Sequence, residues 1–223
     1  MAFTNMFGGK SAAAAEKLPA PAMDLPVDVN AKPGQLHEAI LAGGCFWCID
    51  GVFRQLDGVT SVVSGYAGGS KSTADYETVC TGVTGHAESV KITYDPTKIT
   101  YGKLLQVLFT VIDPTTKDRQ GPDSGTQYRS AIFYENEDQK KVAAAYIAQL
   151  DARHIFPRPI VTTLEPLKPD AFYPAEAYHQ NYVACHLRNP YIQYEALPKI
   201  AKLRAAFPDK LKPTTQSAAD SAE

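Results

Sequence analysis

The chain has 223 residues, a formal net charge of −2 and 44% hydrophobic residues. That length suits one ordinary domain with a sizeable core, and the apolar content excludes a disordered chain. The charge gives no reason to expect nucleic acid or an anionic membrane as a partner, and no apolar stretch approaches the ~20 residues that cross a bilayer.

The predicted elements begin after residues 1–35, which are rich in Ala, Pro and Gly and lack periodicity. The start of this segment has one positive charge, at Lys10, and no apolar run long enough for an export signal, so we expect a cytoplasmic protein. The apolar run 39–42 then predicts a strand. Apolar residues recur about every 3.6 residues from Phe46 to Leu56, which predicts a helix.

Further along, β-branched and alternating segments predict strands, and residues that accept backbone N–H bonds predict helix starts. Strands are expected over 59–66, 87–94, 128–134 and 160–164, with a short strand or loop over 76–80. Thr100 and Asn136 are expected to cap helices that end near Val111 and Leu150, and Pro198 to begin a helix to Phe207. A polar loop is expected over 113–125, and a loop leading into a short helix over 173–186.

This order of elements predicts an α+β fold. We expect a mixed β-sheet with helices packed mainly on one face, a two-layer sandwich of split βαβ (ferredoxin-like) character, with irregular N- and C-terminal segments. The chain divides into a loosely ordered N-terminal arm (1–35), one folded domain (36–211) and a polar C-terminal tail (212–223).

The most informative segment is Gly43-Gly44-Cys45-Phe46-Trp47-Cys48. Cys45 lies between the predicted strand and helix, where unpaired N–H groups and the helix dipole favour a thiolate. A free cysteine thiol has a pKa of about 8.5, and we expect this position to lower the pKa of Cys45 by about one unit or more. A buried structural cysteine is the alternative, but the helix start and the second thiol at Cys48 favour a redox or nucleophilic role.

Other residues could complete a site around Cys45. Phe46 and Trp47 are either core aromatics or an apolar pocket for a methyl group. Glu88, at the start of a predicted strand, would be protonated in an apolar pocket and could then act as a general acid. Tyr76 and Tyr128 could donate hydroxyl hydrogen bonds to a substrate oxygen, although any one of twelve tyrosines is more simply a strand residue.

Five segments together resemble the peptide methionine sulfoxide reductase A family. The family patterns GCFW[CG]xE, GY[ATS]GG, YxxVC[ST]GxTGHAE, RQGxDxGTQYRS and AExYHQxY align with residues 44–50, 65–69, 76–88, 119–130 and 175–182. The resemblance implies that 36–211 is a catalytic domain that reduces methionine-S-sulfoxide, free or in oxidised proteins, and so repairs oxidative damage. It implies a nucleophile at Cys45, a methyl pocket at Phe46 and Trp47, a proton donor at Glu88, hydroxyl donors at Tyr76 and Tyr128, and an orienting carboxylate at Asp123.

The chain departs from the family pattern in two places. Asp50 stands where the family usually has Glu, and Ile192 stands where many relatives have a recycling cysteine. Because no cysteine follows Cys185, we favour Cys48 as the thiol that forms a disulfide with the Cys45 sulfenic acid, with Cys185 as the alternative. Cys80 is expected to be a packed residue.

The resemblance implies no cofactor and no metal. Thioredoxin, or dithiothreitol in vitro, would reduce the disulfide, and we expect a monomer. Two rival functions remain from the residues alone. Strand, C-x-x-C and helix in this order are also typical of a thioredoxin-type oxidoreductase. Cys45 and Cys48 with Cys80, Cys185 or nearby histidines could instead hold structural zinc, although the ligand spacings argue against it.

Overall fold

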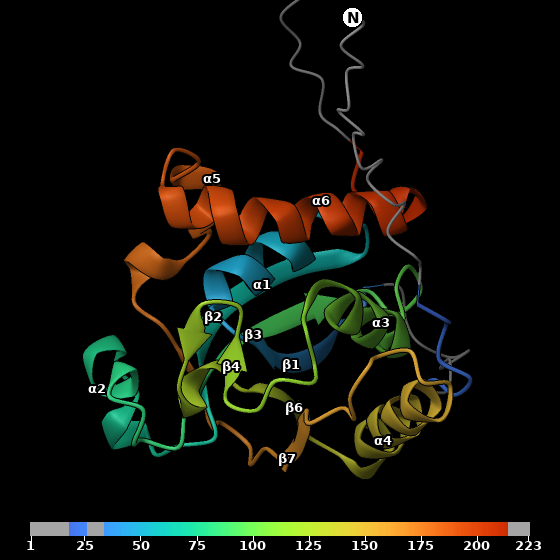
Figure 1. The fold of residues 1–223 in the computed structure, drawn as a ribbon, viewed down its shortest axis with the longest axis horizontal. Helices are drawn as coiled ribbons and strands as arrows, with labels where there is room; N and C mark the ends of the chain where they lie inside the picture. The colour runs from blue at the N-terminus through green and yellow to red at the C-terminus, as the bar shows by residue number, and fades with distance from the viewer. Residues whose placement is uncertain (1–17, 26–33, 214–223) are drawn as a thin grey trace, which may run out of the picture.

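The structure is a computed structural model that describes residues 18–25 and 34–213 (Figure 1). Its sheet has six strands in the order β7-β6-β1-β3-β2-β8. Neighbouring strands are antiparallel except β6 and β7, which are parallel. The strands are β1 (His37–Gly43), β2 (Val59–Ala67), β3 (Ala87–Tyr94), β6 (Ser130–Tyr134), β7 (Thr163–Pro166) and β8 (Phe172–Pro174), and β4 (Arg119–Gln120) pairs separately with β5 (Asp123–Ser124).

The centre of the sheet has the predicted split βαβ arrangement. Strand β3 lies between β1 and β2 and is antiparallel to both, so β1 and β2 run in the same direction. Helix α1 (Phe46–Phe53) connects these two strands, and α3 (Tyr101–Val111) connects β3 to β6 on the other side of β1. The α+β prediction is therefore confirmed, with β7 and β8 added at the two edges of the sheet.

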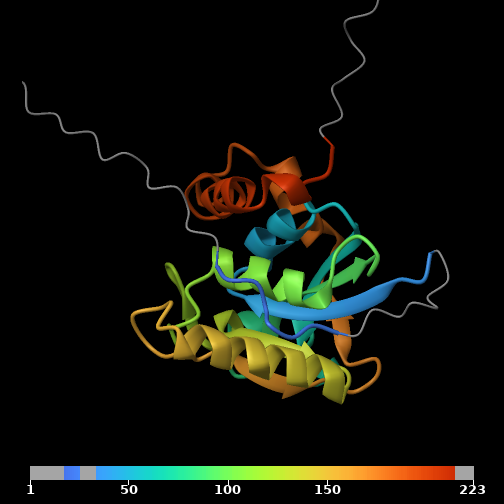
Figure 2. The ribbon, with the colours of Figure 1, turned by 90° about the vertical axis from the view of Figure 1, so that its right-hand side faces the viewer.

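The helices cover one face of the sheet. Helices α1, α3, α4 (Glu137–Ala152) and α6 (Leu197–Ala206) all contribute to one large apolar core, and α1 lies between α6 and the sheet (Figure 2). Because side chains alternate along a strand, Ala39 and Leu41 of β1 join this core, whereas Ile40 and Ala42 join a smaller cluster. The sheet and the helices packed on it thus form the two layers that the sequence predicts, and α6 packs as a further layer outside α1 and α3.

Local capping signals predicted two helix starts correctly. The side chains of Thr100 and Asn136 accept hydrogen bonds from the N–H groups of Lys103 and Gln139. The expected strand or loop over 76–80 was wrong, because this segment is the short helix α2 (Tyr76–Cys80), capped by Asp75. The remaining helical pieces are Lys71–Thr73, Thr126–Tyr128, Ala177–His179, α5 (Tyr182–Cys185), Ile192–Ala196 and Pro208–Lys210.

Part of the N-terminal segment packs on the domain. The side-chain amide of Gln106 donates to the carbonyl of Leu18 (2.5 Å), and the hydroxyl of Tyr146 donates to the carbonyl of Pro19 (2.8 Å). Asp24 accepts from the N–H of Gly102 at the start of α3 (2.8 Å). Residues 18–25 are therefore held more closely than their composition suggests, while the predictions for 1–17, 26–33 and 214–223 lie outside the described residues. Within the described ranges, no helix is long and apolar enough to cross a membrane.

Candidate active site

The site is built where β1 ends and α1 begins. Gly44 has a φ of +88°, and a side chain at this position would collide with Gln120. Glycine therefore allows the chain to turn sharply from strand to helix. Cys45 follows as the N-cap of α1, which confirms the expected position at a helix N-terminus. Its side chain is almost completely buried.

A buried carboxyl group lies beside this turn. The backbone N–H of Phe46 donates to Oε2 of Glu88 (2.9 Å), which reaches the site from β3 and is 2% exposed. Burial raises the pKa of Glu88 to about 8, with a further contribution from the charges of Asp123 and Cys48, while the hydrogen bond from Phe46 opposes the shift. At neutral pH the group is therefore mostly a carboxylic acid, with Oε1 free of the Phe46 hydrogen bond.

The thiol of Cys45 is less acidic than its place at a helix start predicts. Burial raises the pKa of Cys45, and the hydrogen bond with Cys48 and the negative charge of Glu88 add to the shift. The expected lowering was wrong, because loss of solvation of the buried thiolate outweighs the favourable helix terminus. The same contact with Cys45 lowers the pKa of Cys48, so the two thiols form an unequal pair.

Tyr76 and Tyr128 reach the site from different elements, α2 and the turn before β6. Burial raises the pKa of both hydroxyls, and the charges of Glu88 and Cys45 contribute in each case. Both side chains are therefore protonated hydrogen-bond donors near the acid and the thiol. Tyr128 lies in a 3₁₀ turn, not in the strand where the sequence predicted it.

Asp123 is connected to Cys48 through Tyr191, to which the sequence motifs assign no role. The hydroxyl of Tyr191 donates to Oδ2 of Asp123 (2.5 Å), and the Tyr191 hydroxyl oxygen accepts from the thiol of Cys48, with its oxygen 4.0 Å from Sγ. Tyr191 precedes Ile192, which occupies the slot of the absent family cysteine. Its neighbourhood was thus visible in the sequence, but its contact with a residue 68 positions away was not.

Trp47 is held by residues from the C-terminal part of the domain. Its indole N–H donates to Nδ1 of His179 (3.1 Å), and its ring stacks on Tyr182 with a centroid separation of 3.8 Å. Phe46 is buried, with its ring centroid 5.1 Å from that of His179. The two aromatics next to Cys45 are therefore held in place by aromatic side chains, His179 and Tyr182.

Comparison with known proteins decides the family. The family model for peptide methionine sulfoxide reductase matches residues 37–211. The chain belongs to this family. The reductase is 57% identical over 183 residues to "Peptide methionine sulfoxide reductase MsrA 2" of Mesorhizobium japonicum, which covers 82% of this chain and 92% of that protein. It is 50% identical over 175 residues to the MsrA of Thermus thermophilus, with coverage of 78% and 97%.

Solved structures agree with this assignment. Mxr1 of Saccharomyces cerevisiae in its reduced form has a TM-score of 0.64 at 35% identity and covers 71% of this chain and 90% of its own. Methionine sulfoxide reductase A of Corynebacterium diphtheriae has a TM-score of 0.60 at 31% identity, with coverage of 78% and 84%. The protein is thus an MsrA enzyme that reduces methionine sulfoxide.

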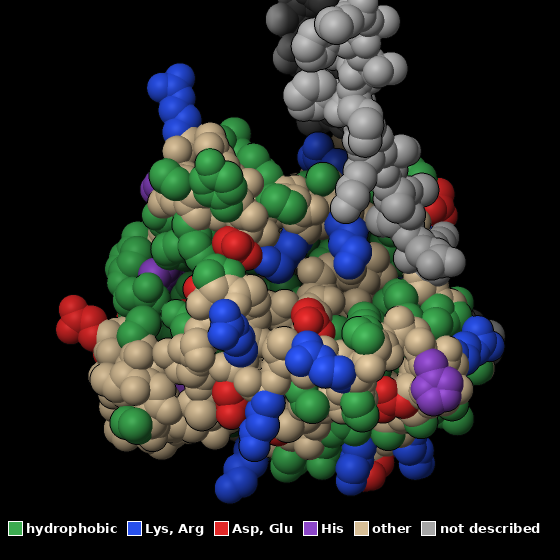
Figure 3. Space-filling view, viewed as in Figure 1, with side chains coloured by type: hydrophobic (Ala, Val, Ile, Leu, Met, Phe, Trp, Pro, Cys, Tyr) green, Lys and Arg blue, Asp and Glu red, His purple; other side chains and the backbone are tan. Residues whose placement is uncertain are grey.

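The family segment 175–182 contributes further residues to which its sequence motif alone assigns no role. In the reductase, Glu176 accepts hydrogen bonds from the hydroxyl of Tyr66 and the N–H of Tyr76, both at 2.9 Å. Tyr178 is 62% exposed, and its ring centroid lies 4.2 Å from that of His179. Hydrophobic side chains gather on the side of the molecular surface where α2 and α5 lie (Figure 3).

All four cysteines of the reductase are free thiols. Cys45 and Cys48 are buried, whereas Cys185, at the end of α5, and Cys80, at the end of α2, are exposed. The expectation that Cys80 is a packed residue was wrong, because the short helix turns its last residue towards solvent. Among the described residues, no three His, Cys, Asp or Glu side chains are grouped so that they could hold a metal ion.

Proposed function

We propose that the reductase acts on methionine-S-sulfoxide, free or in oxidised proteins, with Cys45 as the nucleophile and Glu88 as the proton donor. One observation carries this proposal. The N–H group next to Cys45 donates to Glu88, and burial brings the pKa of that carboxyl to about 8. An ordinary carboxyl is far more acidic than a thiol. Burial raises the pKa of Glu88 to about 8, so this carboxyl, unlike an ordinary one, still holds a proton at neutral pH and can supply it to the sulfoxide oxygen.

The chemical step then balances without a cofactor. The Cys45 thiolate supplies an electron pair to the sulfoxide sulfur, while the proton on Glu88 goes to the sulfoxide oxygen. The substrate's sulfur–oxygen bond breaks, the hydroxyl group is transferred to the Cys45 sulfur, and methionine leaves. The methionine sulfur gains two electrons and Cys45 loses two, so the products are methionine and a Cys45 sulfenic acid.

Orientation of the substrate accounts for selectivity between epimers. Phe46 and Trp47 would contact the methyl group, and the hydroxyls of Tyr76 and Tyr128 would donate to the oxygen. The raised pKa values of both tyrosines support donation by neutral hydroxyls. With methyl and oxygen in fixed places, only one configuration at sulfur leaves the rest of the substrate free to extend outwards, and the family resemblance implies the S form.

We propose Cys48 as the recycling thiol. Its N–H donates to the carbonyl of Cys45 (3.1 Å), and the two thiols contact each other in the first turn of α1. The Cys48 sulfur would attack the sulfur of the Cys45 sulfenic acid, form a disulfide and release water. The lowered pKa of Cys48 supports this order of events, since a thiolate is the attacking form. Cys185 remains the alternative, on a separate short helix.

An external dithiol completes the cycle. It would be oxidised to a disulfide as Cys45 and Cys48 return to thiols, which needs no other co-reactant. We propose thioredoxin for this step, with dithiothreitol as its substitute in vitro.

The test is an assay with the two sulfoxide epimers, in which thioredoxin is kept reduced enzymatically. We expect methionine from the S epimer and none from the R epimer. Equal rates with both would contradict the proposed substrate geometry. Insulin disulfides serve as a second substrate, and their rapid reduction without sulfoxide turnover would favour the thioredoxin-type rival.

A further inference from the structure

We infer that Arg129, anchored by Glu165, is a positioning residue for the reaction. It holds the turn that carries Tyr128 against the loop that precedes Glu88. The inference rests on the proposed function, in which Tyr128 and Glu88 both act on the sulfoxide oxygen. We assign Arg129 no contact with the substrate or with Cys45, so it acts only through the residues that it holds.

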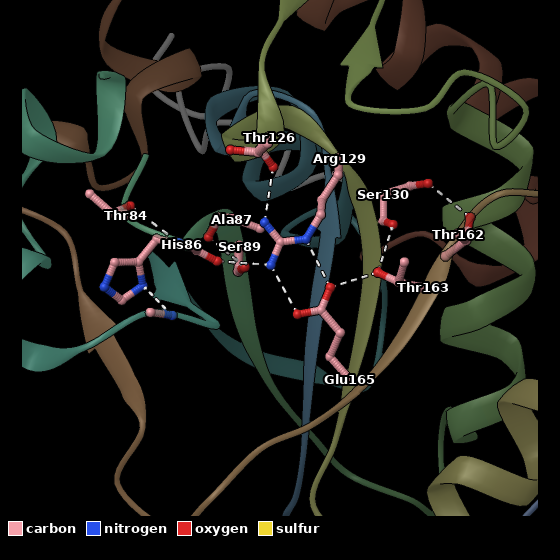
Figure 4. Close-up of polar contacts among 12 residues, drawn as sticks. Thr84, His86, Ala87, Ser89, Thr126, Arg129, Ser130, Thr162, Thr163 and Glu165 are labelled. Atoms are coloured by element: carbon pink, nitrogen blue, oxygen red, sulfur yellow. Dashed lines mark hydrogen bonds and ion pairs between the residues drawn. The ribbon is translucent and has the colours of Figure 1, made fainter. Parts of the chain in front are cut away.

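The contacts of Arg129 join three separate segments (Figure 4). Nε and Nη2 donate to the two carboxylate oxygens of Glu165, at 2.8 Å and 2.9 Å. Nη1 donates to the carbonyl of Thr126 (2.9 Å), and Nη2 also donates to the carbonyl of Gly85 (3.0 Å). A planar guanidinium can make these four bonds at once, whereas a lysine ammonium cannot reproduce the paired geometry.

The turn 126–128 is bound to the neighbouring loop at two more points. The hydroxyl of Thr126 donates to the carbonyl of Gly82 (2.6 Å), and the side-chain amide of Gln127 donates to the carbonyl of Cys80 (3.2 Å). Together with the bond from Arg129 to the carbonyl of Gly85, three hydrogen bonds connect residues 126–129 to residues 80–85. That segment links the helix of Tyr76 to the strand of Glu88. The three proposed donors to the substrate oxygen therefore share one support.

The anchor at Glu165 is itself fixed. Glu165 lies on β7, in register with Phe133 of β6, and also accepts from the hydroxyl of Thr163 (2.6 Å). Although burial raises its pKa, the hydrogen bonds from Arg129 and Thr163 hold the pKa of Glu165 below the ordinary value, so it stays ionised. The side chain of Arg129 is 14% exposed and that of Glu165 is 26% exposed.

The neighbouring backbone leaves the pair little room to move. Gly68 has a φ of +98°, and a Cβ there would lie 2.7 Å from Nη2 of Arg129 and 2.9 Å from the Gly85 carbonyl oxygen. The turn after β2 thus closes directly over the guanidinium. A shift of the pair would have to move this turn, the Glu88 loop and the Tyr128 turn together.

The first experiment compares Arg129→Lys with wild type in a single turnover, in which methionine release is followed without recycling. A displacement of catalytic groups by about 1 Å can cost about 100-fold, and we expect Arg129→Lys to lower the rate about 10- to 100-fold. Arg153→Lys is the matched control, since Arg153 is exposed at the end of α4, and should keep the wild-type rate. Glu165→Gln removes only the ionic anchor and should lower the rate in the same direction, which keeps the test open if Arg129→Lys does not fold.

A double variant separates positioning from simple loss of stability. If Arg129 acts through Tyr128, Arg129→Lys should have a smaller effect once Tyr128 has lost its hydroxyl. The fold-reduction in rate caused by Arg129→Lys should then be at least about threefold smaller in the Tyr128→Phe background than in wild type. If the rate reduction in the double variant equals the product of the two single reductions within about twofold, the two sites are independent. That result would overturn this inference and leave the proposed function intact. An unchanged rate in both Arg129→Lys and Glu165→Gln, with only a lower melting temperature, would also overturn it. A wild-type rate in Tyr128→Phe would contradict the proposed role of Tyr128 and with it this inference.

Discussion

Replacing Glu88 with glutamine removes the proposed proton donor and little else. The amide oxygen of glutamine can still accept the hydrogen bond from the N–H of Phe46, which Glu88 accepts at 2.9 Å. Glutamine cannot supply a proton to the sulfoxide. Because general acid catalysis contributes about 10²- to 10⁴-fold, we expect single-turnover methionine release at neutral pH to fall by at least about 100-fold.

The dependence of the rate on pH gives a sharper test. The reacting form holds one proton on the Glu88–Cys45 pair, and the two pKa values are about 8 for Glu88 and higher for Cys45. In wild type, kcat/KM should therefore rise through about pH 8 and fall again when the second proton leaves. In Glu88→Gln only the Cys45 thiolate is required, so the falling limb should disappear.

Stability should respond to the same carboxyl without any substrate. In the folded state the pKa of Glu88 is raised from 4.5 to about 8, so the protonated form stabilises the fold at low pH and that stability is lost as pH rises from about 4.5 to about 8. From about pH 6 to about pH 9, wild type should lose about 3 kcal/mol more free energy of unfolding than Glu88→Gln does. Denaturant unfolding at several pH values measures this difference.

Glu38→Gln is the control for both measurements, because Glu38 is only half-buried on β1 and pairs only with Lys91 among the ion pairs described (3.3 Å). It should behave like wild type. A Glu88→Gln variant that keeps more than about a third of the wild-type rate at neutral pH, or keeps the falling limb, would rule out Glu88 as the proton donor. A pH dependence of stability equal to that of wild type would show that the Glu88 carboxyl is not buried and protonated.

Three further predictions concern single side chains. Cys45→Ser should release no methionine above background in a rapid-quench assay, and residual turnover would remove Cys45 as the nucleophile. Cys48→Ser should still release one methionine per chain and leave a Cys45 sulfenic acid that mass spectrometry detects, but it should lose thioredoxin-driven turnover. Cys185→Ser should keep thioredoxin-driven turnover. The opposite pattern would move the recycling role to Cys185. Arg54→Ala removes the ion-pair partner of the buried Asp50, whose carboxylate lies 2.6 Å from Nε of Arg54. It should lower the free energy of unfolding by about 3 kcal/mol, and adding Asp50→Asn should restore part of that loss. No loss in Arg54→Ala would mean that the ion pair does not stabilise the fold.

Features of the fold that depend on local chemistry were predictable from the sequence. Thr100 and Asn136 were recognised as caps because a side-chain oxygen followed by a helical period satisfies free N–H groups within one turn. The helix 76–80 was missed because five residues are too few to show a period, although Asp75 with Thr78 already offered a cap. Tyr128 was placed in a strand for the same reason, since its 3₁₀ turn has only three residues.

Features that depend on distant contacts were not predictable in this way. Strand β8 exists because Phe172–Pro174 pairs with β2, more than a hundred residues earlier in the chain. The motifs indicated Glu88 and Trp47, but the burial that raises the pKa of Glu88 and the hydrogen bond from Trp47 to His179, 132 positions away, come from the packed fold. The pKa of Cys45 was predicted in the wrong direction because the degree of burial cannot be read from a helix start alone.

The proposed chemistry of Cys45 and Cys48 is tested most directly by counting free thiols on the fully reduced protein after excess methionine-S-sulfoxide is added without reductant. We expect each chain to release methionine and to lose two thiols, and peptide mapping to find a disulfide between Cys45 and Cys48. Unchanged thiols with no methionine formed would contradict the proposed chemistry at Cys45.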